Sequence, residues 1–413
     1  MFPVSTIIIL SFLFFLPSPG ACSPSSIPLS FSLAHEYRLP HLDHAGTEQI
    51  IFDDTRARPS ASLALRAVPT TIYRPRSAEA IQHARWRSVR HAQSEEVQWD
   101  QVKVLGPDVG DRHTISQLAR MTGNAYALPG QKNWYDIDEA WNVSFPFGWG
   151  ESEGGPRGHV FVSSDNSTVI LSIKGTTVQG ATSKIDKYND NLLFSCCCAR
   201  VDFSWVFSTV CDCYSRHWRC DNTCLSEALI QDSLFYSVGV NLVSNLTTLF
   251  PHSNIWLVGH SLGGALASLL GTTFGFPAIA FESPGESLAA HRLHLPLPPR
   301  SPTSSAPSAP VTHVYHNADP IPQGVCTGFG SPCASAGYAL ETRCHLGKKI
   351  VYDTVNKLGW RVDVRKHIIR EVIMNILELD REWEEGRDVP LAVEEDEDCV
   401  DCWKWEFGDF EDN

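Results

Sequence analysis

A serine flanked by glycines is the strongest chemical feature of the sequence. Residues 259–263 read Gly-His-Ser-Leu-Gly; the short apolar run 254–258 precedes them and the small-residue stretch 265–271 follows. A G-x-S-x-G pattern between a strand and a helix is typical of a nucleophilic serine on a strained turn, where the glycines leave room for the backbone. We therefore predict that Ser261 is the nucleophile of a hydrolase. A glycine-rich turn without catalytic meaning is the alternative.

Such a nucleophile needs a base, and the base needs a carboxylate that orients it. On a turn of this kind the partners follow the serine in the order acid, then histidine. Asp319 is our candidate for the acid, because it directly follows the strand-like run 311–315 and lies in a loop stiffened by prolines. Asp353 and Asp363 remain alternatives.

Two histidines follow Asp319 in the chain and are candidates for the base. His367 comes just before the helical run 368–379, whereas His345 is next to Cys344, in a loop that we expect to be disulfide-bonded. We therefore predict His367 as the base.

A hydrolase of this type also needs two hydrogen-bond donors for the oxyanion of the tetrahedral intermediate. Thr176 follows the strand-like run 168–173, where one of these donors is expected, and it offers both a backbone N–H and a hydroxyl. The backbone N–H of Leu262, directly after the nucleophile, would be the other donor. This chemistry requires no metal and no organic cofactor.

The composition is that of a folded globular protein. The chain has 413 residues, of which 43% are hydrophobic and 19% charged, so we expect neither extensive disorder, nor a collagen-like repeat, nor a multi-span membrane protein. A formal net charge of −14 argues against nucleic acid as the partner. Residues 378–413 hold sixteen acidic and only three basic residues, so most of the imbalance lies there. We expect this segment to be a solvated tail.

Thirteen cysteines indicate an oxidising compartment. Twelve remain when Cys22, beside the hydrophobic leader, is set aside, and seven of these cluster within residues 196–224. Zinc is the rival interpretation, but no Cys-x-x-Cys pair is matched by a second pair at the spacing of a zinc finger. We therefore predict disulfides, whose connectivity the sequence does not give.

The N-terminus agrees with translocation. Residues 4–16 carry no charge, as in the apolar core of a signal peptide, and the longer stretch 1–21 is just able to span a membrane uncleaved. Three sequons are candidate glycosylation sites, at Asn142, Asn166 and Asn245. We therefore expect the rest of the chain to be lumenal.

Strand-like and helical runs follow one another through the middle of the chain. We predict strands at 159–162, 168–173, 254–258, 276–281 and 311–315, and helices at 113–126, 226–249 and 265–271. Segment 22–100 shows no strong periodicity, and the Pro/Ser-rich insert 291–310 is expected to be a surface loop. This order predicts the α/β class, with a largely parallel sheet covered by helices.

Longer motifs around these residues resemble a known family. IKGTT at 173–177, LVGHSLGGALASLL at 257–270 and HNADPIP at 316–322 are similar to the class 3 (filamentous-fungal-type) lipases of the α/β-hydrolase superfamily. More narrowly, the chain resembles the fungal autophagy-related lipases of the vacuole. The narrower resemblance rests on CCCARVDFSWVFSTVCDCY at 196–214, VYDTVNKLGWRVDVRKH at 351–367 and DCVDCWKWEFGDFED at 398–412. It covers most of residues 110–410.

The resemblance implies an α/β-hydrolase fold and a role for each candidate residue. The family's triad falls on Ser261, Asp319 and His367, and its oxyanion positions fall on Thr176 and Leu262. The implied activity is that of a serine lipase that hydrolyses acyl esters of membrane glycerolipids, triacylglycerol and phospholipids, through an acyl-enzyme. A catalytically inactive lipid-binding protein on a hydrolase scaffold and an esterase of soluble esters remain alternatives.

The resemblance also implies a place in the cell. It implies a type II single-pass glycoprotein, anchored by its N-terminal segment, that passes through endosomal multivesicular bodies and the prevacuolar compartment to the vacuole lumen. There it would lyse autophagic bodies, with membrane lipids as its partners and no nucleic acid.

We expect four segments in this chain: a signal-anchor or signal peptide (1–21), an N-terminal lumenal extension (22–105), the class 3 lipase domain (106–380) and an acidic C-terminal tail (381–413). The cysteine-rich segment occupies the position of the family's lid. Its aromatic residues, among them Trp205 and Phe207, would contact lipid if it is a lid; a cross-linked loop that packs on the body is the alternative.

Overall fold

The computed structural model describes residues 35–37, 52–54, 65–138, 143–148, 155–177, 183–197, 210–232, 234–300, 308–326, 333 and 337–410. The leader, the sequon at Asn142 and the aromatic residues Trp205 and Phe207 lie outside these ranges. Within them, no helix combines the length and the apolar character that crossing a bilayer requires.

An eight-stranded sheet forms the centre of the protein, in the order β13-β12-β11-β10-β9-β7-β6-β5. Its strands are β5 (Val143–Phe147), β6 (Gly158–Val162), β7 (Thr168–Ile173), β9 (Asn254–His260), β10 (Ala278–Phe281), β11 (Val311–His316), β12 (Lys348–Tyr352) and β13 (Val393–Glu394). The strands from β7 to β12 in this order pair in parallel, and β5, β6 and β13 add antiparallel edges. This confirms the predicted α/β class with a largely parallel sheet.

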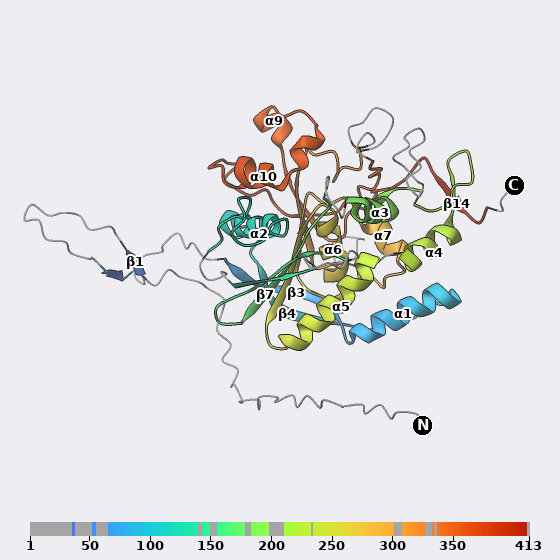
Figure 1. The fold of residues 1–413 in the computed structure, drawn as a ribbon, viewed down its shortest axis with the longest axis horizontal. Helices are drawn as coiled ribbons and strands as arrows, with labels where there is room; N and C mark the ends of the chain where they lie inside the picture. Colours follow the sequence, from blue (N-terminus) through green and yellow to red (C-terminus); the bar gives the residue numbers. More distant parts are fainter. Residues whose placement is uncertain are drawn as a thin grey trace, which may run out of the picture.

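Helices cover both faces of the sheet (Figure 1). They are α1 (Ala78–His91), α2 (Arg112–Asn124), α3 (Ser183–Phe194), α4 (Asn222–Asp232), α5 (Leu234–Leu249), α6 (Leu262–Phe274), α7 (Ser287–Arg292), α9 (Thr354–Leu358) and α10 (Ile369–Val372), with a 3-10 turn η3 (Val364–His367) and a π turn η4 (Ile373–Leu377). The run predicted as one helix at 226–249 falls on α4 and α5.

The two faces have separate apolar cores because side chains alternate along a strand. On β9, Ile255 and Leu257 pack with α5 and α6, whereas Trp256 and Val258 pack on the other face with α2 and η4. β9 is buried on both faces, as a central parallel strand is expected to be. The sheet is therefore a rigid base for the loops at its C-terminal edge.

The segment before residue 106 is more regular than its sequence indicated. β3 (Ala67–Pro75) and β4 (Trp99–Pro107) form an antiparallel pair, with α1 between them in sequence. The indole N–H of Trp256 donates to the backbone oxygen of Leu105 at 2.8 Å, which ties β4 to the central sheet. The domain boundary at 105/106 stays a prediction.

The surface-loop prediction for 291–310 was wrong at its N-terminal end. α7 continues to Arg292, and Leu293 and Leu295 are buried in the core on the α6 side of the sheet. These leucines alternate with a histidine and a proline, so the Pro/Ser bias of the whole insert concealed their apolar pattern. Residues 301–307 lie outside the described part.

The acidic C-terminal segment is not a free, solvated tail. β13 pairs with β12, and the short strand β14 (Glu406–Gly408) pairs with β8 (Arg219–Asp221). Two disulfides, Cys344–Cys399 and Cys196–Cys402, attach the segment between these strands to the body. The many charged residues of this segment led us to predict that it is exposed to solvent. Its two cysteines instead attach it to the body of the protein.

The predicted disulfides are confirmed. Besides the two in the C-terminal segment, the described residues form the bridges Cys197–Cys220, Cys213–Cys224 and Cys326–Cys333. The Cα atoms of each pair lie 5.5–5.8 Å apart, which is the usual separation.

Candidate active site

Ser261 lies on the sharp turn between β9 and α6, as its flanking glycines predict. Its backbone has φ 59° and ψ −130°, a conformation that side-chain-bearing residues seldom adopt. A Cβ on Gly259 would lie 2.1 Å from the carbonyl oxygen of Gly263, and a Cβ on Gly263 would lie 2.2 Å from that of Ile173. The turn thus has space for no side chain at either position, and it holds the hydroxyl at the C-terminal edge of the sheet.

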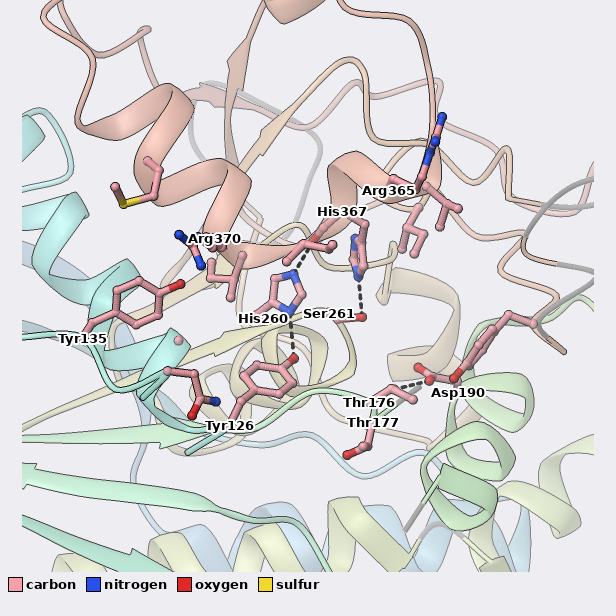
Figure 2. A pocket seen from close by; sticks show the side chains of 18 of the residues that line it. Tyr126, Tyr135, Thr176, Thr177, Asp190, His260, Ser261, Arg365, His367 and Arg370 are labelled. Atoms are coloured by element: carbon pink, nitrogen blue, oxygen red, sulfur yellow. Dashed lines mark hydrogen bonds between the residues drawn. The ribbon is translucent and has the colours of Figure 1, made fainter. Parts of the chain in front are cut away.

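The structure brings the three predicted triad residues together. His367 Nε2 lies 2.8 Å from Ser261 Oγ, and His367 Nδ1 lies 2.6 Å from Asp319 Oδ2. Figure 2 shows the imidazole directly above the serine hydroxyl. The residues come from a turn after β9, the loop after β11 and η3, so they are far apart in sequence. The arrangement allows proton transfer from the hydroxyl to the imidazole.

The alternative carboxylates and the second histidine have other positions. Asp353 and Asp363 are N-caps, of α9 and η3, and accept hydrogen bonds from the backbone N–H groups of Asn356 and Arg365. His345 is buried beside Glu395 and does not line the cavity at Ser261.

Asp319 is held in an ionised state despite complete burial. Burial alone would raise the pKa of its carboxyl, but the charge and the hydrogen bond of His367 bring that pKa below its usual value. The backbone N–H of Ile321 also donates to Asp319 Oδ1 at 3.0 Å. Neighbouring Glu282 has a pKa well above normal, because it is buried and close to Asp319. Of the two carboxyls, Asp319 therefore carries the charge that faces the imidazole.

Two buried histidines that we did not predict hold the backbone around His367. His260 Nε2 donates to the carbonyl oxygen of His367 at 2.7 Å, and His260 Nδ1 lies 2.7 Å from the hydroxyl of Tyr126 (Figure 2). Burial, aided by the nearby His367, lowers the pKa of His260 to about 3, so this ring is neutral. His316 Nε2 donates similarly to the carbonyl oxygen of Lys366 at 3.1 Å.

Thr176 and Leu262, the predicted oxyanion donors, flank the serine. Leu262 is the first residue of α6, where backbone N–H groups have no partner within the helix. Thr176 lies in the loop after β7 and lines the same cavity as Ser261, and its hydroxyl forms a hydrogen bond with Asp190 of α3 (Figure 2). Burial raises the pKa of Asp190 to about 8, so this carboxyl is neutral in acid. Asp190 was not predicted, because only packing brings α3 to this loop.

A cavity of about 760 Å³ opens at Ser261 and His367. Much of its wall is apolar or aromatic, with Trp134, Tyr135, Ile321, Tyr338, Leu340, Val364, Ile368, Ile369 and Met374 among the lining residues. Ile368 and Met374 also have exposed side chains. The cavity thus offers an apolar surface beside the nucleophile, continuous with solvent.

The neutral state of Asp190 predicts a pH dependence of stability. The folded protein keeps this proton up to about pH 8, whereas the unfolded chain releases it near 3.8, the ordinary pKa of an aspartate. The folded state binds more protons between these values, so the free energy of unfolding should fall as the pH rises, by an amount on the order of 2–5 kcal/mol. Asp190→Asn, which has no proton to lose, should flatten this slope in thermal unfolding followed at pH 4, 6 and 8.

The matched control is Asp398→Asn, which changes an exposed carboxylate and should keep the wild-type slope. An Asp190→Asn variant with the same pH slope as wild type would contradict a protonated Asp190.

The chain is similar in sequence to known proteins. The family model described as "Lipase (class 3)" matches residues 200–276. The "Putative lipase ATG15" of Cryptococcus neoformans var. neoformans serotype D (strain B-3501A) is 46% identical over 373 residues, which cover 76% of this chain and 70% of that protein. The protein of the same name from Saccharomyces cerevisiae (strain S288c) is 45% identical over 323 residues, covering 76% and 60%.

Among solved structures, the Lip2 lipase of Yarrowia lipolytica is matched over 57% of this chain and 77% of that one, with 16% identity and a TM-score of 0.31. Because this structural similarity is low, the fold assignment rests instead on the sheet order and on the strained turn at Ser261. Together with the relatives, these features establish that the chain belongs to the ATG15 family of fungal lipases, class 3 lipases with the α/β-hydrolase fold.

Proposed function

We propose that this lipase cleaves acyl esters of membrane glycerolipids through a covalent acyl-enzyme on Ser261. The observation that carries the proposal is the continuous set of contacts from Asp319 through His367 to Ser261, at the wall of a largely apolar cavity. A serine hydroxyl beside an imidazole that is oriented by a buried carboxylate is the arrangement that activates serine as a nucleophile.

In the proposed mechanism, His367 Nε2 takes the proton of Ser261 while Oγ attacks the ester carbonyl. Asp319 stabilises the imidazolium that forms and keeps its Nδ1–H pointed away from the serine. His367 then gives the proton to the leaving alcohol. In the second half-reaction it activates a water molecule, which releases the fatty acid and restores the hydroxyl.

The developing oxyanion would be bound by the backbone N–H of Leu262 and by Thr176. In the structure the hydroxyl of Thr176 donates to Asp190 Oδ2. In the proposed mechanism a neutral Asp190 donates its own proton to Thr176 Oγ1 instead, which frees the threonine hydroxyl to donate to the substrate. One donor of this kind contributes about 3–4 kcal/mol to stabilising the transition state. Acidic conditions, which keep Asp190 protonated, therefore favour this arrangement.

The cavity supports a long-chain substrate over a small soluble ester. Apolar side chains gain about 25 cal/mol for each Å² of apolar surface that they remove from water, and the lining offers an acyl chain such a surface next to Ser261. We propose both phospholipids and triacylglycerol as substrates, with membrane lipids as the natural partner.

We further propose that the protein acts in the vacuole, on autophagic bodies and multivesicular-body membranes, after passage through endosomes as a lumenal glycoprotein anchored by residues 1–21. The name ATG15 of the relatives supports the autophagy-related role, and the disulfides support a route through an oxidising compartment. The sequon asparagines Asn166 and Asn245 are exposed, on the β6–β7 turn and on α5, where a glycan has room.

The test compares three substrates with one preparation. Purified protein is incubated with phospholipid vesicles, with a triacylglycerol emulsion and with a water-soluble short-chain ester, and released fatty acid is measured against the Ser261→Ala variant as the blank. We expect Ser261-dependent release from vesicles and emulsion at least about tenfold faster than from the soluble ester.

Faster hydrolysis of the soluble ester would identify an esterase instead. No release from any substrate, together with failure of a fluorophosphonate probe to label Ser261, would identify a catalytically inactive lipid-binding protein.

A further inference from the structure

A second cluster of reactive side chains lies in the interior, away from the cavity at Ser261. Glu286 precedes α7, His313 lies within β11, and His345 lies in the loop before β12; all three are buried. One ligand atom of each lies within 4.8 Å of the other two. None of them lines the cavity at Ser261, and the proposed ester hydrolysis uses none of them.

Each of the two imidazoles has a polar partner on its Nδ1 atom, which orients the ring. His345 Nδ1 lies 3.1 Å from Glu395 Oε2, and His313 Nδ1 lies 2.9 Å from Ser283 Oγ. Metal-binding histidines in proteins usually have this arrangement, in which one nitrogen contacts a carboxylate or other polar group and the other faces the ion. The nitrogen of each ring that would face an ion is therefore Nε2.

Two buried polar atoms of the cluster have no hydrogen-bond partner. They are Glu286 Oε2 and His313 Nε2. His313 Nε2 lies 3.0 Å from Glu286 Oε1 without the alignment of a hydrogen bond, and His345 Nε2 has only the carbonyl oxygen of Ser283, at a long 3.3 Å. A buried polar atom without a partner costs about 1–3 kcal/mol. Glu286 Oε2 is such an atom, whereas His313 Nε2 has the ion pair with Glu286 Oε1.

We propose that Glu286, His313 and His345 bind a structural zinc ion. Two histidines and one glutamate bind zinc in known sites that keep water in the fourth position, with metal–ligand distances of about 2.0–2.2 Å. Ligand atoms at these distances and at tetrahedral angles are roughly 3.3 Å apart, which the cluster reaches by small side-chain shifts. Glu286 Oε1 already accepts two hydrogen bonds, so Oε2 is the oxygen that would bind the ion. The fourth position would be left for water.

The position of the cluster gives the ion a role in holding the fold together. Glu395 belongs to the acidic C-terminal segment; it accepts from His345 Nδ1 and from Lys349 at 2.8 Å. Glu286 also accepts hydrogen bonds from Ser268 of α6 and from the backbone N–H of Leu346. A zinc ion here would join α6, α7, β11 and the C-terminal segment at one point.

The experiment measures the metal directly. Untagged full-length protein is purified without chelator, and zinc per chain is determined by inductively coupled plasma mass spectrometry. The variants are Glu286→Gln, which keeps an oxygen for Ser268 and Leu346, and His313→Gln. The control is His159→Gln, which removes a buried imidazole on β6 outside the cluster.

We expect about one zinc per chain in wild type and in the control, and at least a tenfold loss in both cluster variants. Removing the ion from wild type with a chelator should lower the melting temperature by about 3–8 °C, and added zinc should restore it. Cobalt added to the metal-free wild type should give the visible absorption of a tetrahedral site.

If a variant fails to fold, the zinc content, cobalt absorption and melting temperature of the wild-type protein still test the proposal. Zinc-free wild-type protein that gives neither a cobalt spectrum nor a shift in melting temperature would overturn the proposal, and so would equal zinc content in wild type and in the folded cluster variants. None of these readouts depends on ester hydrolysis, so they are independent of the proposed lipase activity.

Discussion

Replacing Ser261 with alanine is expected to lower kcat for ester hydrolysis by about 10⁵, with little change in stability. The variant loses the only atom that forms the acyl-enzyme, whereas the cavity and the oxyanion donors remain. Alanine also tolerates the backbone of Ser261 as well as serine does, so folding should be preserved. The measurement is kcat on vesicles at substrate saturation, with the melting temperature recorded beside it.

Ser253→Ala provides the matched control. Its hydroxyl donates to the carbonyl oxygen of Asn166, at the opposite end of β9 from Ser261. We expect wild-type kcat from this variant. Residual hydrolysis within tenfold of wild type in Ser261→Ala would mean that another group performs the attack, and the mechanism proposed here would be abandoned.

Replacing Asp319 with asparagine is expected to lower kcat by about 10⁴. The amide fills the same space, but its NH₂ group can donate to His367 Nδ1. The imidazole then carries its proton on Nε2, facing Ser261, and is no longer a base. The loss should appear in kcat at every pH at which the wild type is active, because a change of pH does not move the imidazole proton from Nε2 back to Nδ1.

Asp353→Asn is the control, since this carboxylate was the alternative acid and the structure places it as the N-cap of α9. We expect kcat within about twofold of wild type. If Asp353→Asn were the inactive variant and Asp319→Asn the active one, the assignment of the acid would be reversed.

The sequence predicted the parts of the site that local chemistry dictates. The turn at Ser261 was recognisable because only glycine fits beside it, and the order of the partners then reduced the acid to three candidates and the base to two. Its position directly after a strand favoured Asp319. The helical run after His367, and the disulfide loop expected around His345, favoured His367. Five strands of the sheet, β6, β7, β9, β10 and β11, were predictable from short, mostly apolar runs, which a buried sheet requires. The strands β5, β12 and β13 were not predicted.

The remaining parts depend on contacts between distant segments. Asp190 lies on a helix whose sequence shows no reason for a buried carboxyl, and it meets Thr176 only after folding. His260 is inside the predicted motif, yet its role depends on Tyr126, which is 134 positions away in the chain. The hydrophobic periodicity of a single segment gives no information about such contacts between distant residues.

The two bridges that fix the acidic C-terminal segment make it indispensable. A chain ending before residue 399, for example through a premature stop codon, would leave Cys196 and Cys344 as unpaired thiols in a protein with many other disulfides. Both are buried and lie close to groups of functional interest, Cys196 just after the helix of Asp190 and Cys344 next to His345. Such thiols would attack neighbouring bridges during oxidative folding, so truncation should yield scrambled, retained protein rather than a shortened enzyme.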